Sequence, residues 1–121
     1  GKEVEQAMQI ASSNTNIQIK EFTVAPQVNP LEGELPFHEW FIEFEKEPEN
    51  MLEFSKTIDE EMQRQNTYYF DLIQGNILQQ LKISKVKKNG FDNYMRSVGK
   101  LGGQNKIPRL ANDRKIADQL K

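Results

Sequence analysis

Residues 36–45, Pro-Phe-His-Glu-Trp-Phe-Ile-Glu-Phe-Glu, are the segment that most constrains the fold. In an extended chain, successive side chains point to opposite faces of a sheet. Trp40, Ile42 and Phe44 then line one face, and Phe37 and Phe41 line the other. A strand with apolar residues on both faces is typical of an interior strand that is covered on both sides. This segment therefore predicts a sheet with packed layers above and below it.

The chain before this strand predicts a helix, a strand and a loop. Apolar residues recur at helical spacing in 2–14, namely Val4, Ala7, Met8 and Ala11. In 16–24 the apolar alternation changes phase near Lys20 and Glu21, which indicates a β-bulge. The prolines, asparagine and glycine of 26–33 predict a loop.

The chain after the central strand predicts two consecutive helices. Glu47-Pro48-Glu49 is expected to open the first, because proline suits the first helical turn and carboxylates suit its positive end. Its core-facing stripe consists of Met51, Phe54, Ile58 and Met62. Asn66 is expected to end this helix, and a shorter one then runs from Tyr68 to Gln74 and stops at Gly75-Asn76.

The remaining chain predicts a third strand over 79–87, a turn at Asn89-Gly90 and a short helix over 91–98. A last helix over 113–120, capped by Asn112, is expected at the end. The predicted order is helix, strand, strand, helix, helix, strand, helix, loop, helix. We therefore expect a single α+β domain over 1–121, with a small mixed β-sheet flanked by helices.

The charged residues are unevenly distributed along the chain. Residues 1–81 contain 5 Lys/Arg and 15 Asp/Glu, a balance of −10, whereas residues 82–121 contain 11 Lys/Arg and 3 Asp/Glu, a balance of +8. This asymmetry fits either an anionic partner for the C-terminal third or mutual attraction of the two parts within one fold.

Few residue types that support catalysis are present. Without cysteine, the chain has no disulfide, thiolate metal site or thiol nucleophile, which fits a reducing compartment. His38 is the only histidine, so a multi-histidine metal site is excluded, and we expect it at the margin of the core. The acidic pairs Glu43/Glu45 and Glu60/Glu61 are expected on solvated faces.

Two further clusters have a structural and a binding interpretation. Tyr68-Tyr69-Phe70 is expected in core or interface packing, because no motif for RNA-base stacking accompanies it. The lysines of the third strand, Lys82, Lys85, Lys87 and Lys88, predict a solvated edge strand or, alternatively, a track for nucleic-acid phosphates.

Residues 100–109, Lys-Leu-Gly-Gly-Gln-Asn-Lys-Ile-Pro-Arg, carry the strongest chemical signal. Gly102 and Gly103 can adopt positive φ, which lets successive backbone N–H groups converge on an anion. Lys100 and Lys106 flank them, and Pro108 favours extended geometry at the preceding residue. The segment is either an ordinary glycine turn in a basic loop or a site for an anion; it is not a Walker A motif.

Three runs together resemble a known family: Phe-His-Glu-Trp-Phe-Ile-Glu-Phe at 37–44, Phe-Asp-Asn-Tyr-Met-Arg-Ser at 91–97, and residues 99–114 around the glycine segment. In order and spacing they resemble the C-terminal domain of the auxin-responsive promoter (Gretchen Hagen) family of acyl-acid amido synthetases, in its bacterial branch. The resemblance implies the small cap domain of an acyl-adenylating enzyme, a fragment whose large N-terminal adenylating domain is absent from this sequence.

The resemblance also implies the chemistry. The family uses ATP, with magnesium, to convert a carboxylic acid into an acyl-adenylate, and an amine then displaces AMP. Plant members read Gln-Tyr-Lys-Thr-Pro-Arg where this chain reads Gln104-Asn-Lys-Ile-Pro-Arg109, so the family's catalytic lysine corresponds to Lys106. Lys100, Gly102, Gly103, Gln104 and Arg109 are the implied nucleotide contacts. Asn105 and Ile107 differ from the plant motif, so the plant substrates do not carry over.

These implications define the expected partners. They are the N-terminal domain, a carboxylic acid and an amine, and the expected location is the cytoplasm. No membrane or nucleic acid is expected as a partner. The complete enzyme is expected to be active, whereas this domain alone is expected to be inactive and to bind no cofactor. Two alternatives stay open: a module that binds a polyanion through the basic segment 82–115, and a structural domain of a parent that has lost activity.

Overall fold

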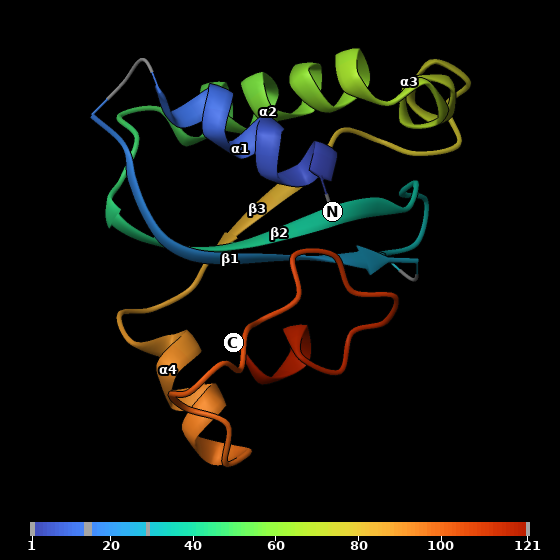
Figure 1. The fold of residues 1–121 in the computed structure, drawn as a ribbon. Coiled ribbons are helices and arrows are strands. Elements are labelled where there is room, and N and C mark those ends of the chain that lie inside the picture. Colours follow the sequence, from blue (N-terminus) through green and yellow to red (C-terminus); the bar gives the residue numbers. More distant parts are fainter. Residues whose placement is uncertain (1, 14–15, 29, 121) are drawn as a thin grey trace.

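The structure, a computed structural model, describes residues 2–13, 16–28 and 30–120 and arranges them in three layers (Figure 1). The predicted end of the first helix at Asn14 and the loop residue Asn29 lie outside these ranges. One face of a central sheet is covered by α1 (Lys2–Ser13), α2 (Met51–Gln65) and α3 (Thr67–Gln74). The other face is covered by α4 (Gly90–Ser97) and by the C-terminal segment with the short 3-10 helix η1 (Ala117–Gln119).

The sheet is mixed, which confirms the predicted α+β class. Its strands β1 (Gln18–Gln27), β2 (Phe37–Lys46) and β3 (Lys82–Lys85) lie in the order β1-β2-β3. Strand β1 is antiparallel to β2, whereas β3 is parallel to it. The central position of β2 is the one that its two apolar faces predicted.

Two apolar clusters hold the layers together. Trp40 and Ile42 pack toward the helices α1 to α3, whereas Phe41 packs toward α4 on the opposite face of β2. In α1, the buried residues are the four of the predicted stripe: Val4, Ala7, Met8 and Ala11. Burial of such apolar faces is the main favourable contribution to folding.

The predicted bulge in β1 is confirmed by register shifts between Gln18 and Ile19 and between Ile19 and Glu21. The shift places Ile19 and Phe22 on the same side of the sheet. Both residues pack in the apolar cluster between the sheet and the helices α1 to α3. The loop predicted from residue 26 onward is wrong at its start, since Pro26 pairs with His38 inside β1. Proline is tolerated there because β1 is an edge strand.

Three predicted boundaries are corrected. Helix α2 begins at Met51 rather than near Pro48, because the Asn50 side chain caps it by accepting a hydrogen bond from the N–H of Glu53 at 3.0 Å. Strand β3 comprises four residues instead of nine. The segment predicted as the last helix forms turns and only the three-residue η1.

The last helix fails for a local reason. Asp113 accepts a hydrogen bond from the N–H of Lys115 at 3.0 Å, an Asx-type turn that competes with helical hydrogen bonding. Asn112 makes no capping contact that would offset this competition in the described chain. Leu120 nevertheless packs in the apolar cluster below the sheet.

Several other predictions about side chains are resolved. His38 lies 5.3 Å from the ring of Tyr69, at the margin of the core as expected. Tyr69 is buried, but Tyr68 and Phe70 are exposed, so the core interpretation holds for one of the three aromatic residues. Within the described ranges, no helix has both the length and the apolar composition that a membrane crossing needs.

Candidate functional site

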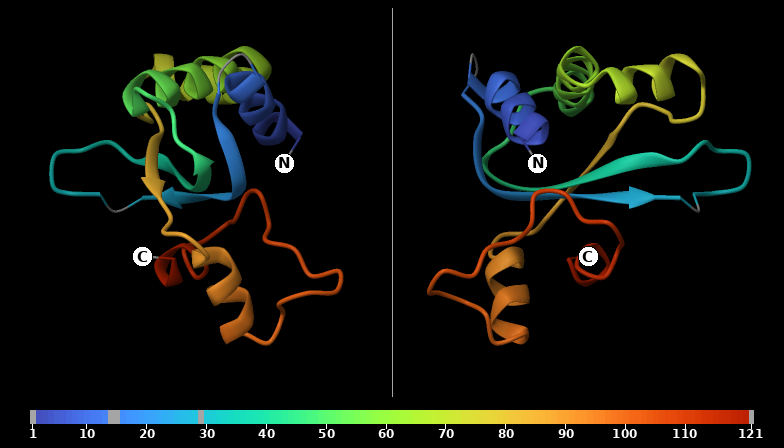
Figure 2. Two further views of the ribbon diagram at one scale, coloured as in Figure 1. Left: turned by 90° about the vertical axis from the view of Figure 1, so that its left-hand side faces the viewer. Right: turned by 45° about the vertical axis from the view of Figure 1, so that its right-hand side comes forward.

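The chain between α4 and the C-terminal segment is an exposed loop built on glycine. Gly99 has φ +71° and ends α4, while Gly102 and Gly103 have φ +89° and +65°. The positive φ predicted for the glycine pair is therefore confirmed. A Cβ at any of the three positions would meet nothing within 4 Å, so each glycine faces open space. Figure 2 shows the chain leaving α4, extending away and returning to β1.

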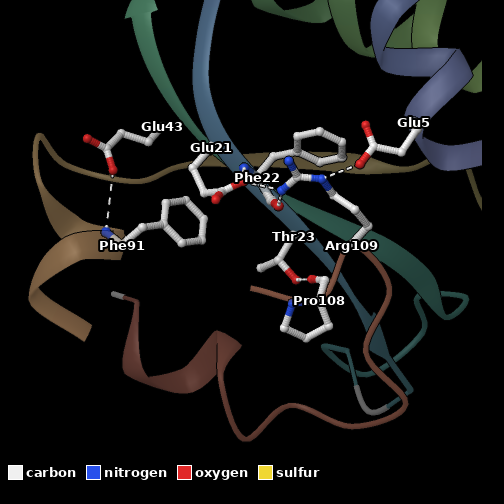
Figure 3. A network of polar contacts seen from close by, with 8 residues as sticks. All are labelled: Glu5, Glu21, Phe22, Thr23, Glu43, Phe91, Pro108 and Arg109. Atoms are coloured by element: carbon white, nitrogen blue, oxygen red, sulfur yellow. Dashed lines mark hydrogen bonds and ion pairs between the residues drawn. The ribbon is translucent and has the colours of Figure 1, made fainter. Parts of the chain in front are cut away.

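The residues directly after the loop are firmly anchored to the free edge of β1. The carbonyl of Pro108 accepts a hydrogen bond of 2.6 Å from the buried hydroxyl of Thr23 (Figure 3). The N–H of Val24 donates to the carbonyl of Arg109, and the carbonyl of Val24 accepts from the N–H of Ala111, both at 2.9 Å. These bonds form a parallel bridge between Val24 and Leu110. Lys106 thus lies between the exposed glycine loop and the segment that is bonded to β1.

Ile107 completes this anchor from the apolar side. Its side chain is 6% exposed and packs in the cluster below the sheet. Lys106, one residue earlier, is exposed. Within the described chain, the Lys106 ammonium forms no hydrogen bond or ion pair. The backbone is therefore held on one side of Lys106 while its charge stays available.

Arg109 is bonded inside the domain (Figure 3). Its guanidinium forms ion pairs with Glu5 of α1, at 2.6 Å, and with Glu21 of β1. It also donates to the carbonyl of Phe22 at 2.7 Å and lies 4.3 Å from the centre of the Phe22 ring. A guanidinium is suited to this arrangement, because its planar donors bind carboxylates while its face stacks on an aromatic ring.

A groove of about 300 Å³ lies between the loop, α4 and the start of β1. Its floor is apolar, formed in part by Phe91, Met95 and Ile107. Its charged lining residues are Lys20, Glu21, Asp92 and Lys106. A larger cavity, of about 490 Å³, lies between α1 and α2 and has no lining residue in common with this groove.

Glu43 lies in the interior, so the prediction of a solvated position for it is wrong. It is 2% exposed rather than solvated, and its carboxylate accepts from the N–H groups of Asn89, at 2.7 Å, and Phe91, at 3.4 Å. It therefore caps α4, whose own cap residue Asn89 contributes no side-chain hydrogen bond to the helix end. The alternation that turns Phe41 inward also places Glu43 on that face, which was a usable signal.

Lys20 links this cap to the groove. Its ammonium lies 3.5 Å from Glu43 and 3.1 Å from Asp92, and it donates to the side chain of Asn89 at 3.2 Å. The hydrogen bond to Asp92, together with the charge of Glu43, raises the pKa of Lys20 against the opposing effect of its partial desolvation. The start of α4 is thus fixed by two charged residues, Lys20 of β1 and Glu43 of β2.

The structure brings most of the predicted site residues into one loop. Lys100, Gly102, Gly103, Gln104 and Lys106 are all exposed there. Arg109 lies apart from them in its contacts with Glu5 and Glu21. Of the lysines predicted on the third strand, Lys82 and Lys85 lie on the edge strand β3 and pair with Glu34 and Glu47. Lys87 and Lys88 lie beyond the end of β3 and are exposed. Of the acidic residues expected in solvent, Glu45 and Glu60 are exposed and Glu61 pairs with Arg64.

Comparisons with known proteins give a consistent picture. The family described as GH3 family C-terminal domain matches residues 2–115. A solved GH3.15 acyl acid amido synthetase matches with a TM-score of 0.70 and 18% identity, over 98% of this chain and 21% of that one. The structure of AtGH3.15 acyl acid amido synthetase in complex with 2,4-DB matches with a TM-score of 0.73 and 16% identity, over 98% and 22%.

These matches establish the fold, and the chain spans about a fifth of the length of either solved structure. No curated protein sequence matches the chain.

Proposed function

The chain belongs to the GH3 family, as its C-terminal domain, and on that premise we propose that it completes the adenylation site of an ATP-dependent acyl acid amido synthetase. In this proposal, Lys106 approaches the α-phosphate of ATP while a carboxylic acid attacks it. The acid oxygen forms a bond to the α-phosphorus, and the bond to pyrophosphate breaks. An amine then displaces AMP from the acyl-adenylate to form an amide.

The observation that supports this role is the state of Lys106. Its ammonium is exposed and forms no ion pair within the described residues, while the backbone after it is bonded to β1. A cation held in this way can stabilise charge that develops on a phosphate without first breaking a contact. Phosphoryl transfer depends mainly on such positioned charges.

The other residues of the glycine loop also suit a nucleotide phosphate. Lys100 supplies a second exposed cation, and Gly102, Gly103 and Gln104 present backbone and amide donors in an open loop. A contact of Arg109 with the nucleotide would require its ion pairs to Glu5 and Glu21 to open. Among the described residues, no group of carboxylates or imidazoles is arranged to hold a metal ion, so we assign no step to magnesium.

We also propose which molecules this chain acts with and where. Its partners would be an N-terminal adenylating domain and the acid and amine substrates, in the cytoplasm of a bacterium. The alternative of polyanion binding has less support, since four of the C-terminal cations are already paired with carboxylates of the N-terminal part: Lys82, Lys85, Arg109 and Arg114.

The test is acid-dependent exchange of pyrophosphate into ATP by the complete protein, across a panel of carboxylic acids. Lys106→Ala should lower the exchange rate by about 10²–10³-fold, the effect of removing one donor to a transition state. Lys56→Ala, at an exposed lysine of α2 on the opposite side of the sheet, is the matched control and should leave the rate unchanged. A loss below threefold in Lys106→Ala would remove this lysine from the chemistry.

A further inference from the structure

Both carboxylates in the groove beside Lys106 are already paired with other cations. The acidic lining residues are Glu21 and Asp92. Glu21 is bonded to Arg109, and Asp92 lies 3.1 Å from the ammonium of Lys20. Lys106 lines the same groove and has no such partner within the described ranges. Each carboxylate lining the groove therefore has a cation as partner, whereas Lys106 has no ion pair among the described residues.

This distribution has a direct electrostatic consequence. Lysine carries a compact charge on a long and flexible stem, so it can reach a nearby carboxylate without a change of backbone. A free carboxylate in the groove would attract the Lys106 ammonium, and that ion pair would compete with an incoming anion. An ion pair between each carboxylate and another cation reduces this competition.

Arg109 is held more firmly than an ordinary surface arginine. Its side chain is 30% exposed, and it is fixed by the carbonyl of Phe22, the ring of Phe22 and the carboxylate of Glu5 in addition to Glu21. Its backbone carbonyl is bonded to the N–H of Val24. Arg109 follows Lys106 by three residues, so the same anchored segment supplies both the free cation and the guanidinium that occupies Glu21.

We propose that Arg109 is a positioning residue for Lys106: it holds the Glu21 carboxylate and thereby keeps the Lys106 ammonium free for an anionic group. That this anion is a phosphate of ATP rests on the function proposed above, whereas the free state of Lys106 does not. The sequence predicts that Arg109 contacts the nucleotide directly. A direct contact and a positioning role through Glu21 differ in their expected effects, so an experiment can distinguish them.

The first test measures the free state of Lys106 and needs no activity. Lysines of the complete protein, without nucleotide, are acetylated with a water-soluble reagent, and the labelling of Lys106 is compared with that of Lys100 in the same loop. In Arg109→Met, Lys106 should label about two- to fivefold more slowly, the size expected for a partly exposed ion pair with the released Glu21. The double variant Arg109→Met/Glu21→Gln should restore wild-type labelling.

Two results would overturn the proposal. One is unchanged labelling of Lys106 in Arg109→Met, and the other is protection that persists in the double variant. Arg109→Gln, which retains a donor for the Phe22 carbonyl, takes the place of Arg109→Met if the latter does not fold. Arg64→Met is the control, because it breaks an exposed ion pair with Glu61 on α2 and should not change Lys106.

The second test separates positioning from direct contact. In pyrophosphate exchange, Arg109→Met should lower kcat with little change in the KM for ATP, and the added Glu21→Gln should recover part of kcat. A raised KM for ATP that Glu21→Gln does not correct would assign Arg109 to the nucleotide and overturn the proposal. If the wild-type protein exchanges with no acid, the proposed function fails, and the labelling result still decides the role of Arg109.

Discussion

Glu43 illustrates how a single buried charge can organise a distant element. It lies on β2 but bonds to two N–H groups at the start of α4, the helix that leads into the glycine loop. The first N–H groups of a helix lack partners within the helix, and a carboxylate there also interacts favourably with the helix dipole. The position of the loop therefore depends on a residue 46 positions before Asn89.

Glu43→Gln should lower the free energy of unfolding by about 1–3 kcal/mol, because an amide replaces a buried charged acceptor of two backbone N–H groups. Urea denaturation followed by circular dichroism measures this loss. Glu45→Gln, the same substitution two residues later at an exposed position, should stay within about 0.5 kcal/mol of wild type. Equal effects in both variants would show that the cap contributes nothing.

His38 provides a pH-dependent contribution to stability. Burial lowers its pKa, although the charge of Asp59 acts in the opposite direction. In the unfolded chain the pKa of histidine is about 6.5, so below that pH the unfolded state binds more protons than the folded state. The contribution of neutral His38 is therefore complete above pH 6.5 and is lost as the pH falls toward the folded pKa.

Between pH 7 and pH 5, wild type should lose more stability than His38→Gln, as measured by the urea midpoints of both proteins at each pH. Because the chain has one histidine, NMR titration of its imidazole signal gives the folded pKa directly. A folded pKa above 6.5, or equal losses in both proteins, would contradict the assignment.

At the scale of elements, Asp59 of α2 joins three consecutive parts of the chain. Its buried carboxylate accepts from the hydroxyl of Tyr69 in α3, from the N–H of Leu81 before β3 at 3.2 Å, and from the side chain of Gln63 at 2.7 Å. Burial, together with the Asp59 carboxylate, raises the pKa of Tyr69, so its phenol stays protonated and donates. This network fixes the crossover that brings β3 parallel to β2.

Tyr69→Phe should destabilise the domain by about 1–2 kcal/mol, since Asp59 loses one of its donors while remaining buried. The adjacent Tyr68 is 73% exposed, so Tyr68→Phe is the matched control and should have no measurable effect. Thermal and urea denaturation of the two variants measure the difference. Similar stabilities for both would indicate that the hydroxyl of Tyr69 is dispensable.

At the scale of the whole molecule, part of the charge asymmetry of the sequence is compensated by ion pairs within the fold. Ion pairs connect the C-terminal cations Lys82, Lys85, Arg109 and Arg114 to carboxylates of the N-terminal part. This supports the interpretation that the two parts attract each other. The exposed lysines of the glycine loop, Lys100 and Lys106, are not among these paired cations.

The pair of Arg114 with Glu39 is the least exposed of these, at 2.9 Å with side chains 17% and 11% exposed. Arg114→Met should therefore cost about 2 kcal/mol, between the values for a surface pair and a fully buried one. Arg64→Met, at an arginine whose side chain is 63% exposed, should cost less than about 0.5 kcal/mol. Comparable losses in urea denaturation would contradict a role of burial.

The sequence by itself determined the order of the elements up to α4, the central position of β2 and the bulge in β1. It also identified the positive φ of Gly102 and Gly103. These features depend on local periodicity and on the conformational range of single residues, so a short window of sequence contains them. The three quoted runs indicated the family, which the match over 2–115 confirmed.

Only the tertiary structure decided which N–H groups Glu43 caps, the partners of Arg109 and the free state of Lys106. Each depends on contacts between residues that are far apart in the chain, such as Glu5 and Arg109. The same holds for the anchoring of 107–111 on β1, because Thr23 of this strand lies 85 residues before Pro108. Charge in a sequence shows which groups are present, but the fold decides which of them are neutralised and which remain free to act.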